Sequence, residues 1–205
     1  MGSQEKRRYR GFAWNVKAAA ATRAAKPADD VTLAERVARL FEEQQIAYAL
    51  IGASAVAARG LARSTYDVDL FTVDKRVLES EIWEPIRPFA YVEVRRGDLF
   101  DPLKGVVWIR PEKERPIDIV VGRWKWEQRV IERAELVDSP TGRLPTVTTS
   151  DLILLKLAAG GGQDAWDIGR LLKIASETVI AEVEERLPDL QQDARDLWQR
   201  IRRGV

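Results

Sequence analysis

The pattern of apolar and polar positions along the chain first becomes regular just after residue 30. Thr32 and Glu35 lie three residues apart, which is the spacing of a capping box at the start of a helix. One apolar stripe at helical spacing follows, made of Leu33, Val37, Leu40 and Phe41. The pattern therefore predicts a first helix that begins near Val31.

Short apolar runs then alternate with helical segments as far as residue 148. Strands are expected at 48–51, 66–73, 90–94, 105–109 and 116–121, with further short strands near Leu136 and Val147. Helices are expected at 53–58, 77–86 and 124–133. From residue 149 onward the pattern is helical only. This order predicts an α+β fold, with a mixed sheet flanked by helices and a C-terminal helical subdomain.

The same order divides the chain into three regions. Residues 1–30 combine a basic run, an alanine-rich stretch and Pro27, and we expect this segment to be weakly ordered. Residues 31–148 are expected to form the core domain. Residues 149–205 are expected to form the helical subdomain, in which a glycine triplet at 160–162 separates the first two helices.

Composition narrows the chemistry that this chain can perform. Among its 205 residues there is no cysteine and no histidine, and the net charge is +1. These absences exclude disulfides, thiolate zinc sites, cysteine nucleophiles and histidine acid–base catalysis. The side-chain groups that remain for catalysis are carboxylates, lysine, arginine and hydroxyls. A metal ion bound by these groups would be one that prefers oxygen ligands, such as Mg²⁺ or Mn²⁺.

Hydropathy argues against a membrane protein. No apolar run reaches the length of a membrane span, and the first residues lack the apolar core of a secretory signal. We therefore expect a cytoplasmic protein with no membrane partner. Basic residues gather at both ends of the chain, and solvated tails explain them more simply than RNA binding does.

The predicted strand at 66–73 carries two acids, Asp67 and Asp69. Residues two apart in a strand point to the same face at roughly 6.5–7 Å, so Val68 and Leu70 would enter the core on the other face. Two carboxylates at that distance repel by about 2 kcal/mol at an effective dielectric near 20. A divalent cation between them would relieve the repulsion. The alternative is a solvent-facing strand that merely carries two polar positions.

A glycine and a serine precede this acidic strand, in a turn that could bind a phosphate. Gly52 and Ser54 lie between a predicted buried strand and a predicted helix. A glycine there lets the backbone approach a phosphate, and the hydroxyl and the helix start both favour an anion. Taken alone, the segment is better explained as an ordinary strand-to-helix turn, and only its place before the acidic strand favours phosphate binding.

A third acid, Asp118, lies inside the strongly apolar predicted strand at 116–121. An unpaired charge in such surroundings would be expensive. If this strand lies beside the strand at 66–73, Asp118 completes a three-carboxylate site for two metal ions and helps to deprotonate an attacking hydroxyl. The alternative is a structural ion pair with Arg115 or Arg123 at the edge of the sheet.

These motifs resemble those of the nucleotidyltransferase superfamily related to DNA polymerase β. The resemblance rests on G-A-S at 52–54, R-S-T-Y-D-V-D-L at 63–70 and I-D-I at 117–119. Two later segments, D-L-I-L-L-K-L-A-A at 151–159 and Q-D-A-W-D-I-G-R-L-L at 163–172, are similar to the later motifs of its AbiEii/MenT-type toxin branch. Together the motifs span about residues 48–172.

The resemblance implies a role for each matching residue. Asp67, Asp69 and Asp118 would be catalytic and would bind Mg²⁺ or Mn²⁺. The nucleotide-binding residues would be Gly52, Ser54, Arg63, Thr65, Lys156 and Asp167. Several of these residues also have structural interpretations: Arg63 and Thr65 could only shape a loop, Lys156 could extend to the surface, and Asp167 could brace the helical subdomain.

The activity that the resemblance implies is the transfer of a nucleoside monophosphate from an NTP to a hydroxyl. The acceptor would be the 3′ end of a tRNA or a protein, in a toxin–antitoxin or phage-defence system with an antitoxin partner. One departure from the family pattern stands against this activity, because Gln163 replaces a basic residue. Ala53 in place of a second glycine is a milder departure, since alanine still leaves room for a phosphate. A catalytically silent protein that binds nucleotide, RNA or a partner protein is the alternative. A purely structural cation site in an unrelated α+β protein is a third hypothesis.

Overall fold

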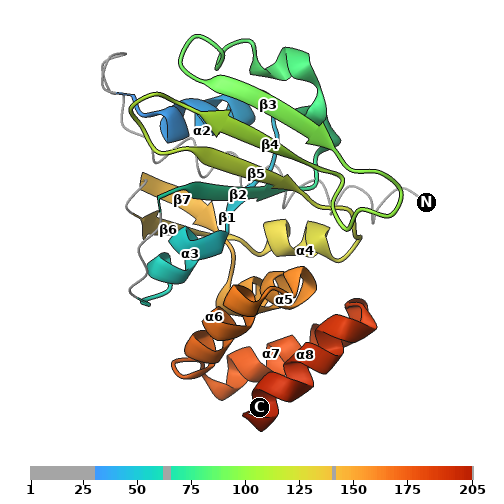
Figure 1. Ribbon diagram of the computed structural model, residues 1–205. Coiled ribbons are helices and arrows are strands. Elements are labelled where there is room, and N and C mark those ends of the chain that lie inside the picture. The colour runs from blue at the N-terminus through green and yellow to red at the C-terminus, as the bar shows by residue number, and fades with distance from the viewer. Residues whose placement is uncertain (1–30, 62–65, 140–141, 205) are drawn as a thin grey trace, which may run out of the picture.

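The computed structural model describes residues 31–61, 66–139 and 142–204. Within these ranges seven strands form one mixed sheet in the order β3-β4-β5-β2-β1-β7-β6 (Figure 1). The strands are β1 (Ala49–Leu50), β2 (Val68–Thr72), β3 (Tyr91–Arg96), β4 (Gly105–Arg110), β5 (Ile117–Val121), β6 (Glu135–Ser139) and β7 (Gly142–Thr146). The predicted α+β class with a mixed sheet flanked by helices is confirmed.

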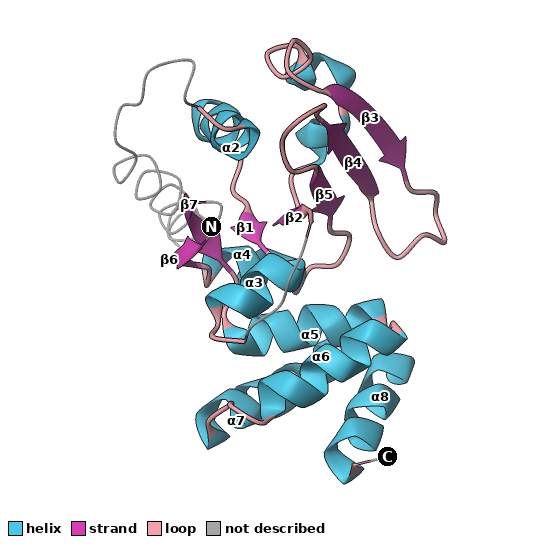
Figure 2. Cartoon of the chain, turned by 60° about the vertical axis from the view of Figure 1, so that its left-hand side comes forward, coloured by secondary structure: helices cyan, strands magenta, loops and turns pink. Residues whose placement is uncertain are grey.

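Helices precede, interrupt and follow the sheet. The α-helices are α2 (Leu33–Glu43), α3 (Gly52–Ala58), α4 (Glu127–Glu132), α5 (Thr149–Ala159), α6 (Gly162–Leu172), α7 (Glu177–Arg186) and α8 (Gln192–Arg203). In the described part of the chain the 3₁₀ helices are η2 (Lys75–Leu78), η3 (Ser80–Trp83) and η4 (Leu187–Asp189). Every described element from Thr149 onward is helical, as the sequence predicts, and Figure 2 shows α5–α8 gathered below the sheet. Residues 1–30, for which we predict weak order, lie outside the described residues.

The first helix begins as its sequence dictates. The Thr32 side chain accepts a hydrogen bond from the backbone of Glu35, and the Glu35 carboxylate accepts one from the backbone of Thr32. Both halves of the predicted capping box are therefore present. The apolar stripe of α2 is buried against the sheet, and Phe41 packs against the rings of Tyr48 and Trp83.

The centre of the sheet brings together strands that are far apart in sequence. Strand β2 pairs with β5 in parallel and with β1 in an antiparallel direction, while β4 pairs with β5 in an antiparallel direction. One face of these strands is apolar and buried under α2, η2 and η3. Its buried residues are Val68, Leu70, Val107, Ile109, Ile117, Ile119 and Val121. The alternating positions on β2 and β5 therefore emerge on the opposite face.

One predicted helix, at 77–86, is replaced by the two short helices η2 and η3. The chain becomes extended at Glu79 between them, and the Asp74 side chain caps η2 by accepting from the Arg76 backbone. Pro85 and Pro88 follow at once, and proline disfavours a continuing α-helix both in itself and in the residue before it. Trp83 is buried here, with its indole N–H donating to the Val77 carbonyl at 2.8 Å.

A buried ionic cluster joins α4, α5 and α7. Asp151 is fully buried, and its carboxylate accepts hydrogen bonds from Arg133 at 2.6 and 2.9 Å and from the Thr148 hydroxyl at 2.8 Å. Arg186, on α7, reaches the same carboxylate at 3.4 Å. Because Arg133, Asp151 and Arg186 come from three different helical segments, the cluster ties these helices together below the sheet.

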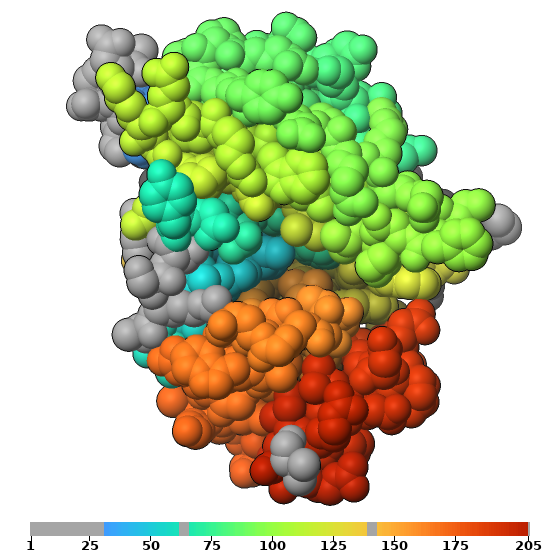
Figure 3. Space-filling model, viewed as in Figure 1, coloured from blue at the N-terminus to red at the C-terminus, as the bar shows by residue number. Residues whose placement is uncertain are grey.

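The face shown in Figure 1 is hollowed between the sheet and the helices below it. In Figure 3 the yellow-green atoms of the strands stand above this hollow and the orange atoms of α5 and α6 stand below it. The cyan segment that contains α3 is visible at its base. Within the described ranges, no helix combines the length and the apolar character that crossing a membrane requires.

Candidate active site

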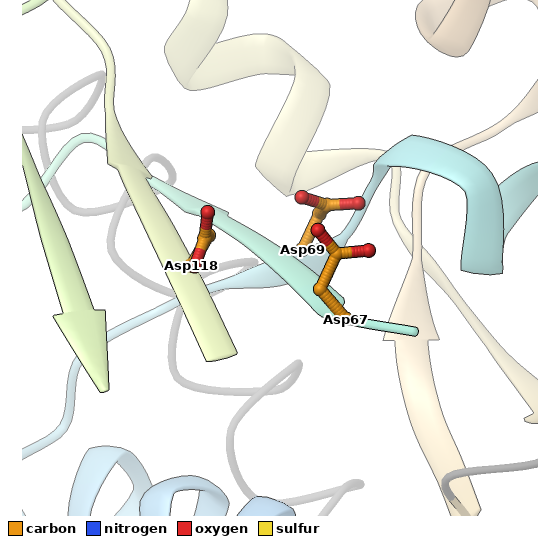
Figure 4. A group of neighbouring side chains, drawn as sticks. All are labelled: Asp67, Asp69 and Asp118. Atoms are coloured by element: carbon orange, nitrogen blue, oxygen red, sulfur yellow. The ribbon is translucent and has the colours of Figure 1, made fainter. Parts of the chain in front are cut away.

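Three carboxylates from two neighbouring strands converge on one side of the sheet. Asp67 immediately precedes β2, Asp69 lies within it, and Asp118 lies on β5. Each contributes an oxygen, and these oxygens lie within 4.8 Å of one another (Figure 4). All three side chains are partly exposed. The structure therefore brings together the three acids that the sequence singles out.

The pairing of β2 with β5 explains this convergence. In the parallel register Asp69 lies directly opposite Asp118, so their side chains emerge on the same face of the sheet. Asp67 reaches that face as well, because it is two residues before Asp69. Val68 and Leu70 point into the core, as their alternation with the acids predicts.

The electrostatics of the site are those of a partly buried acidic cluster. Burial, the largest cause, and the neighbouring charges of Asp67 and Asp118 together raise the pKa of Asp69 to about 6. A hydrogen bond from the Ala53 backbone N–H and the charge of Lys156 act in the opposite direction. A cation bound beside such a carboxylate would stabilise its charged form.

Gly52 is in direct contact with Asp69. Its φ angle is +62°, and a Cβ at this position would overlap the Asp69 carboxylate and lie 2.8 Å from Asp69 Cβ. Only glycine fits such a position without strain. Ser54, which is buried, donates a long hydrogen bond of 3.5 Å to the Asp67 carbonyl. The turn that the sequence assigns to phosphate binding therefore also holds the acidic strand.

Asp118 has an arginine partner, but neither of the two that the sequence suggests. The Arg110 guanidinium, from the end of β4, donates to Asp118 Oδ1. Arg123 instead donates to the carbonyls of Asp98 and Leu103. Asp118 therefore belongs both to the acidic cluster and to an ion pair, and its role toward a metal ion stays a prediction.

Lys156 lies at the junction of α5 and α6 and not at the surface. It is 7% exposed, and its Nζ contacts Asp164 at 2.9 Å and Asp167 at 2.7 Å. Asp167 is fully buried. The surface interpretation of Lys156 is therefore wrong, and Asp167 does brace the two helices. Because its charge lowers the pKa of Asp69, Lys156 also acts electrostatically on the acidic cluster.

The outcome for the remaining site residues is mixed. Arg63 and Thr65 lie outside the described residues. Arg110 is the site residue that the sequence interpretation misses. A signal for it exists, because the strands predicted at 105–109 and 116–121 are close enough in sequence to form a hairpin, which would bring Arg110 beside Asp118.

The donor set fits a hard divalent cation. Mg²⁺ and Mn²⁺ bind carboxylate oxygens, and all three members of the cluster are carboxylates that face one point. Burial and the neighbouring charges of Asp67 and Asp118 raise the pKa of Asp69, and a bound cation would offset both effects. Asp67, Asp69 and Asp118 would hold the ion, as the sequence predicts.

Comparisons with known proteins agree with this fold. The chain is similar to the solution structure of the antibiotic-resistance factor ANT(2″)-Ia, at 15% identity and a TM-score of 0.50, over 77% of this chain and 90% of that one. It is also similar to an antigenic nucleotidyltransferase-like protein from Paracoccidioides brasiliensis, at 16% identity and a TM-score of 0.46, over 84% and 95% of the two chains. No protein-family model matches the sequence, and no curated protein does either.

The likeness to ANT(2″)-Ia shows that this chain has the nucleotidyltransferase fold. The predicted superfamily resemblance is therefore supported at the level of the fold. Its assignment to the AbiEii/MenT-type branch stays a prediction.

Proposed function

We propose that this protein is a metal-dependent nucleotidyltransferase that moves a nucleoside monophosphate from an NTP to a hydroxyl, so that the bond between the α- and β-phosphates breaks and pyrophosphate leaves. One observation carries the proposal: on a nucleotidyltransferase fold, three acids from β2 and β5 place oxygens within 4.8 Å of one another. A structural role alone does not explain why three like charges share one face of a sheet.

Each residue of the site has a part in the proposed reaction. Asp67, Asp69 and Asp118 hold the divalent cation, which when bound neutralises phosphate charge. Gly52 and Ser54 border the acids on the α3 side, where we place the triphosphate. Asp118, on the β5 side, is the group that we propose to accept the proton of the incoming hydroxyl.

Further members of the proposed nucleotide site are Lys156, Arg63 and Thr65. Lys156 stands on the helices below the sheet, and its effect on Asp69 supports a position near the phosphates. Its contacts with Asp164 and Asp167 hold the ammonium group in place before any nucleotide arrives. Such preorganisation reduces the entropy that binding must overcome.

The acceptor that we propose is the 3′ end of a tRNA or a protein hydroxyl. The support is the resemblance of 151–159 and 163–172 to the later motifs of the toxin branch. The same resemblance supports a toxin role in a toxin–antitoxin or phage-defence system, with an antitoxin protein as partner.

Label transfer tests this function directly. The protein is incubated with Mg²⁺, each α-labelled NTP in turn, and total tRNA, and the products are separated into RNA and protein fractions. We expect label on one fraction with wild-type protein and none with Asp67→Ala/Asp69→Ala. Label transfer that survives in this double variant would contradict the assignment of the site.

A catalytically silent nucleotidyltransferase-fold protein is the second candidate. The observation that favours it is that groups of the site are already engaged within the chain: Arg110 binds Asp118, and the Ala53 N–H binds Asp69. This candidate predicts nucleotide, RNA or protein binding without label transfer from any NTP, in Mg²⁺ or in Mn²⁺.

A further inference from the structure

Asp118 forms an ion pair with a cationic side chain of the same chain, that of Arg110. Arg110 Nη1 donates to Asp118 Oδ1, and its other acceptors are the carbonyls of Ile117 at 3.4 Å and Ile109 at 3.5 Å. Both carbonyl contacts are at the long end of hydrogen-bond lengths. The carboxylate of Asp118 is therefore the principal partner of this guanidinium.

The sheet register places Arg110 on the same face as the acidic cluster. Trp108 lies directly opposite Asp118, and Arg110 is two residues further along β4, so both side chains emerge on that face. From there Arg110 reaches diagonally across to β5. It approaches Asp118 from the side away from Asp69, because β5 lies between β4 and β2.

The pair is exposed enough to be broken. The Arg110 side chain is 43% exposed and that of Asp118 is 24% exposed. Ion pairs that are open to water contribute only about 0–1 kcal/mol, because solvent screens them. A ligand with a stronger attraction for Asp118 can therefore displace this arginine at little cost.

We propose that Arg110 competes with the divalent cation for Asp118. This inference rests on the proposed function, since it concerns the metal site of that function. A carboxylate shared by a guanidinium and a divalent cation would hold two cations within a few ångströms of each other, and their repulsion weakens metal binding. Asp118 therefore joins the metal site fully only when Arg110 releases it, whereas Asp67 and Asp69 are the first carboxylates to engage the ion.

Mn²⁺ binding without nucleotide tests the competition, with the free-ion signal in electron paramagnetic resonance as the readout. The full-length wild type is compared with Arg110→Gln, which removes the charge, and with Arg110→Lys, which keeps it. Arg87→Gln is the matched control, because Arg87 is also a partly exposed arginine in an ion pair, with Glu84. Circular dichroism establishes that each variant is folded.

We expect Arg110→Gln to bind Mn²⁺ about threefold to fivefold more tightly than the wild type, which corresponds to the upper part of the range for the loss of one exposed ion pair. Arg110→Lys and Arg87→Gln should stay within about twofold of the wild type. In an Asp118→Asn background the effect of Arg110→Gln should disappear. Equal tightening in that background would show a general charge effect and would overturn the proposal.

The failure of this inference can be told apart from the failure of the proposed function. If wild-type protein binds Mn²⁺, loses it in Asp69→Asn and gains no affinity in Arg110→Gln, the metal site stands and the competition is refuted. If neither wild type nor Arg110→Gln binds Mn²⁺, the metal site itself is refuted, and the competition with it.

Discussion

Gly52 lies against Asp69 so closely that no larger residue fits between the first turn of α3 and the acidic strand. A Cβ on Gly52 would overlap the Asp69 carboxylate, and the φ angle of +62° is one that side-chain-bearing residues rarely adopt. The next amide, that of Ala53, donates a hydrogen bond to the same carboxylate. The glycine turn therefore positions Asp69, whatever it also offers to a phosphate.

Replacing this glycine should disturb the site more than it disturbs the fold. We expect Gly52→Ala to cost about 1–3 kcal/mol of unfolding free energy, from backbone strain and from the displaced Asp69. It should also remove the stabilisation that Mn²⁺ gives. Urea unfolding with and without Mn²⁺ measures both effects.

Gly60→Ala is the matched control for that experiment. Gly60 also has a positive φ, of +93°, but a Cβ there would meet no atom within 4 Å. This variant should lose about 1 kcal/mol and keep its response to Mn²⁺. If Gly52→Ala kept the same response to Mn²⁺, the contact with Asp69 would have no role in the site.

Removing only one member of the buried ion pair between Lys156 and Asp167 should lower the unfolding free energy strongly. Lys156→Met removes the ammonium at 2.7 Å from a fully buried carboxylate, which should lower the unfolding free energy by about 3–5 kcal/mol. In Lys156→Met/Asp167→Leu much of this loss should be recovered, because no buried charge remains. Urea denaturation of the single and double variants measures both values.

Asp164→Asn provides the comparison for Lys156, since Asp164 contacts the same ammonium at 2.9 Å but is 26% exposed. It should cost about 1 kcal/mol or less. An equal loss from Asp164→Asn and Lys156→Met would show that burial of Asp167 is not the source of the effect.

The raised pKa of the Glu127 carboxyl should make the stability of the protein depend on pH. This carboxyl is buried, and burial raises its pKa from 4.5 to about 7, against the hydrogen bonds that it accepts from the backbone N–H groups of Trp124 and Arg123. Between pH 4.5 and 7 the folded protein therefore holds a proton that the unfolded chain has lost. The contribution of Glu127 to the unfolding free energy should fall by about 3 kcal/mol as the pH rises through this window, and then level off.

Glu127→Gln removes the titrating group and keeps a side-chain oxygen that can accept from the Trp124 N–H. The difference in unfolding free energy between variant and wild type should therefore grow in favour of the variant from pH 5 to pH 7. Chemical denaturation at half-unit pH steps measures it. A constant difference across this range would refute the raised pKa.

The sequence predicts the acidic cluster because strand alternation is a local property. The spacing of Asp67 and Asp69 places both on one face, and the apolar neighbours Val68 and Leu70 determine which face is buried. The position of Asp118 beside Asp69 depends on which strands pair, and the sequence could state it only as a condition. The parallel pairing of β2 with β5 then fulfils that condition.

What the sequence could not supply is the identity of partners that come from other elements. Arg110 was missed because three arginines near Asp118 are equally plausible until the β4–β5 register is known. The burial of Lys156 was also unpredictable, because a lysine on an apolar helix is buried only if acids on another helix meet it. The prediction of one helix at 77–86 was wrong. It gave more weight to the helical spacing of apolar residues than to the two prolines that follow Trp83.

Metal-dependent NTP binding tests the central claim most directly. Isothermal titration calorimetry would compare wild type in Mg²⁺, wild type in EDTA, and Asp67→Asn/Asp69→Asn in Mg²⁺, for each of the four NTPs. Glu93→Gln is the matched control, because Glu93 lies in the same row across the sheet, opposite Trp108, two strands away from Asp118. We predict that at least one NTP binds wild type and Glu93→Gln alike in Mg²⁺, and about tenfold or more weakly in EDTA or in the double variant. NTP binding that is equal in all four samples, or absent from wild type, would contradict the assignment of these acids to a metal–nucleotide site.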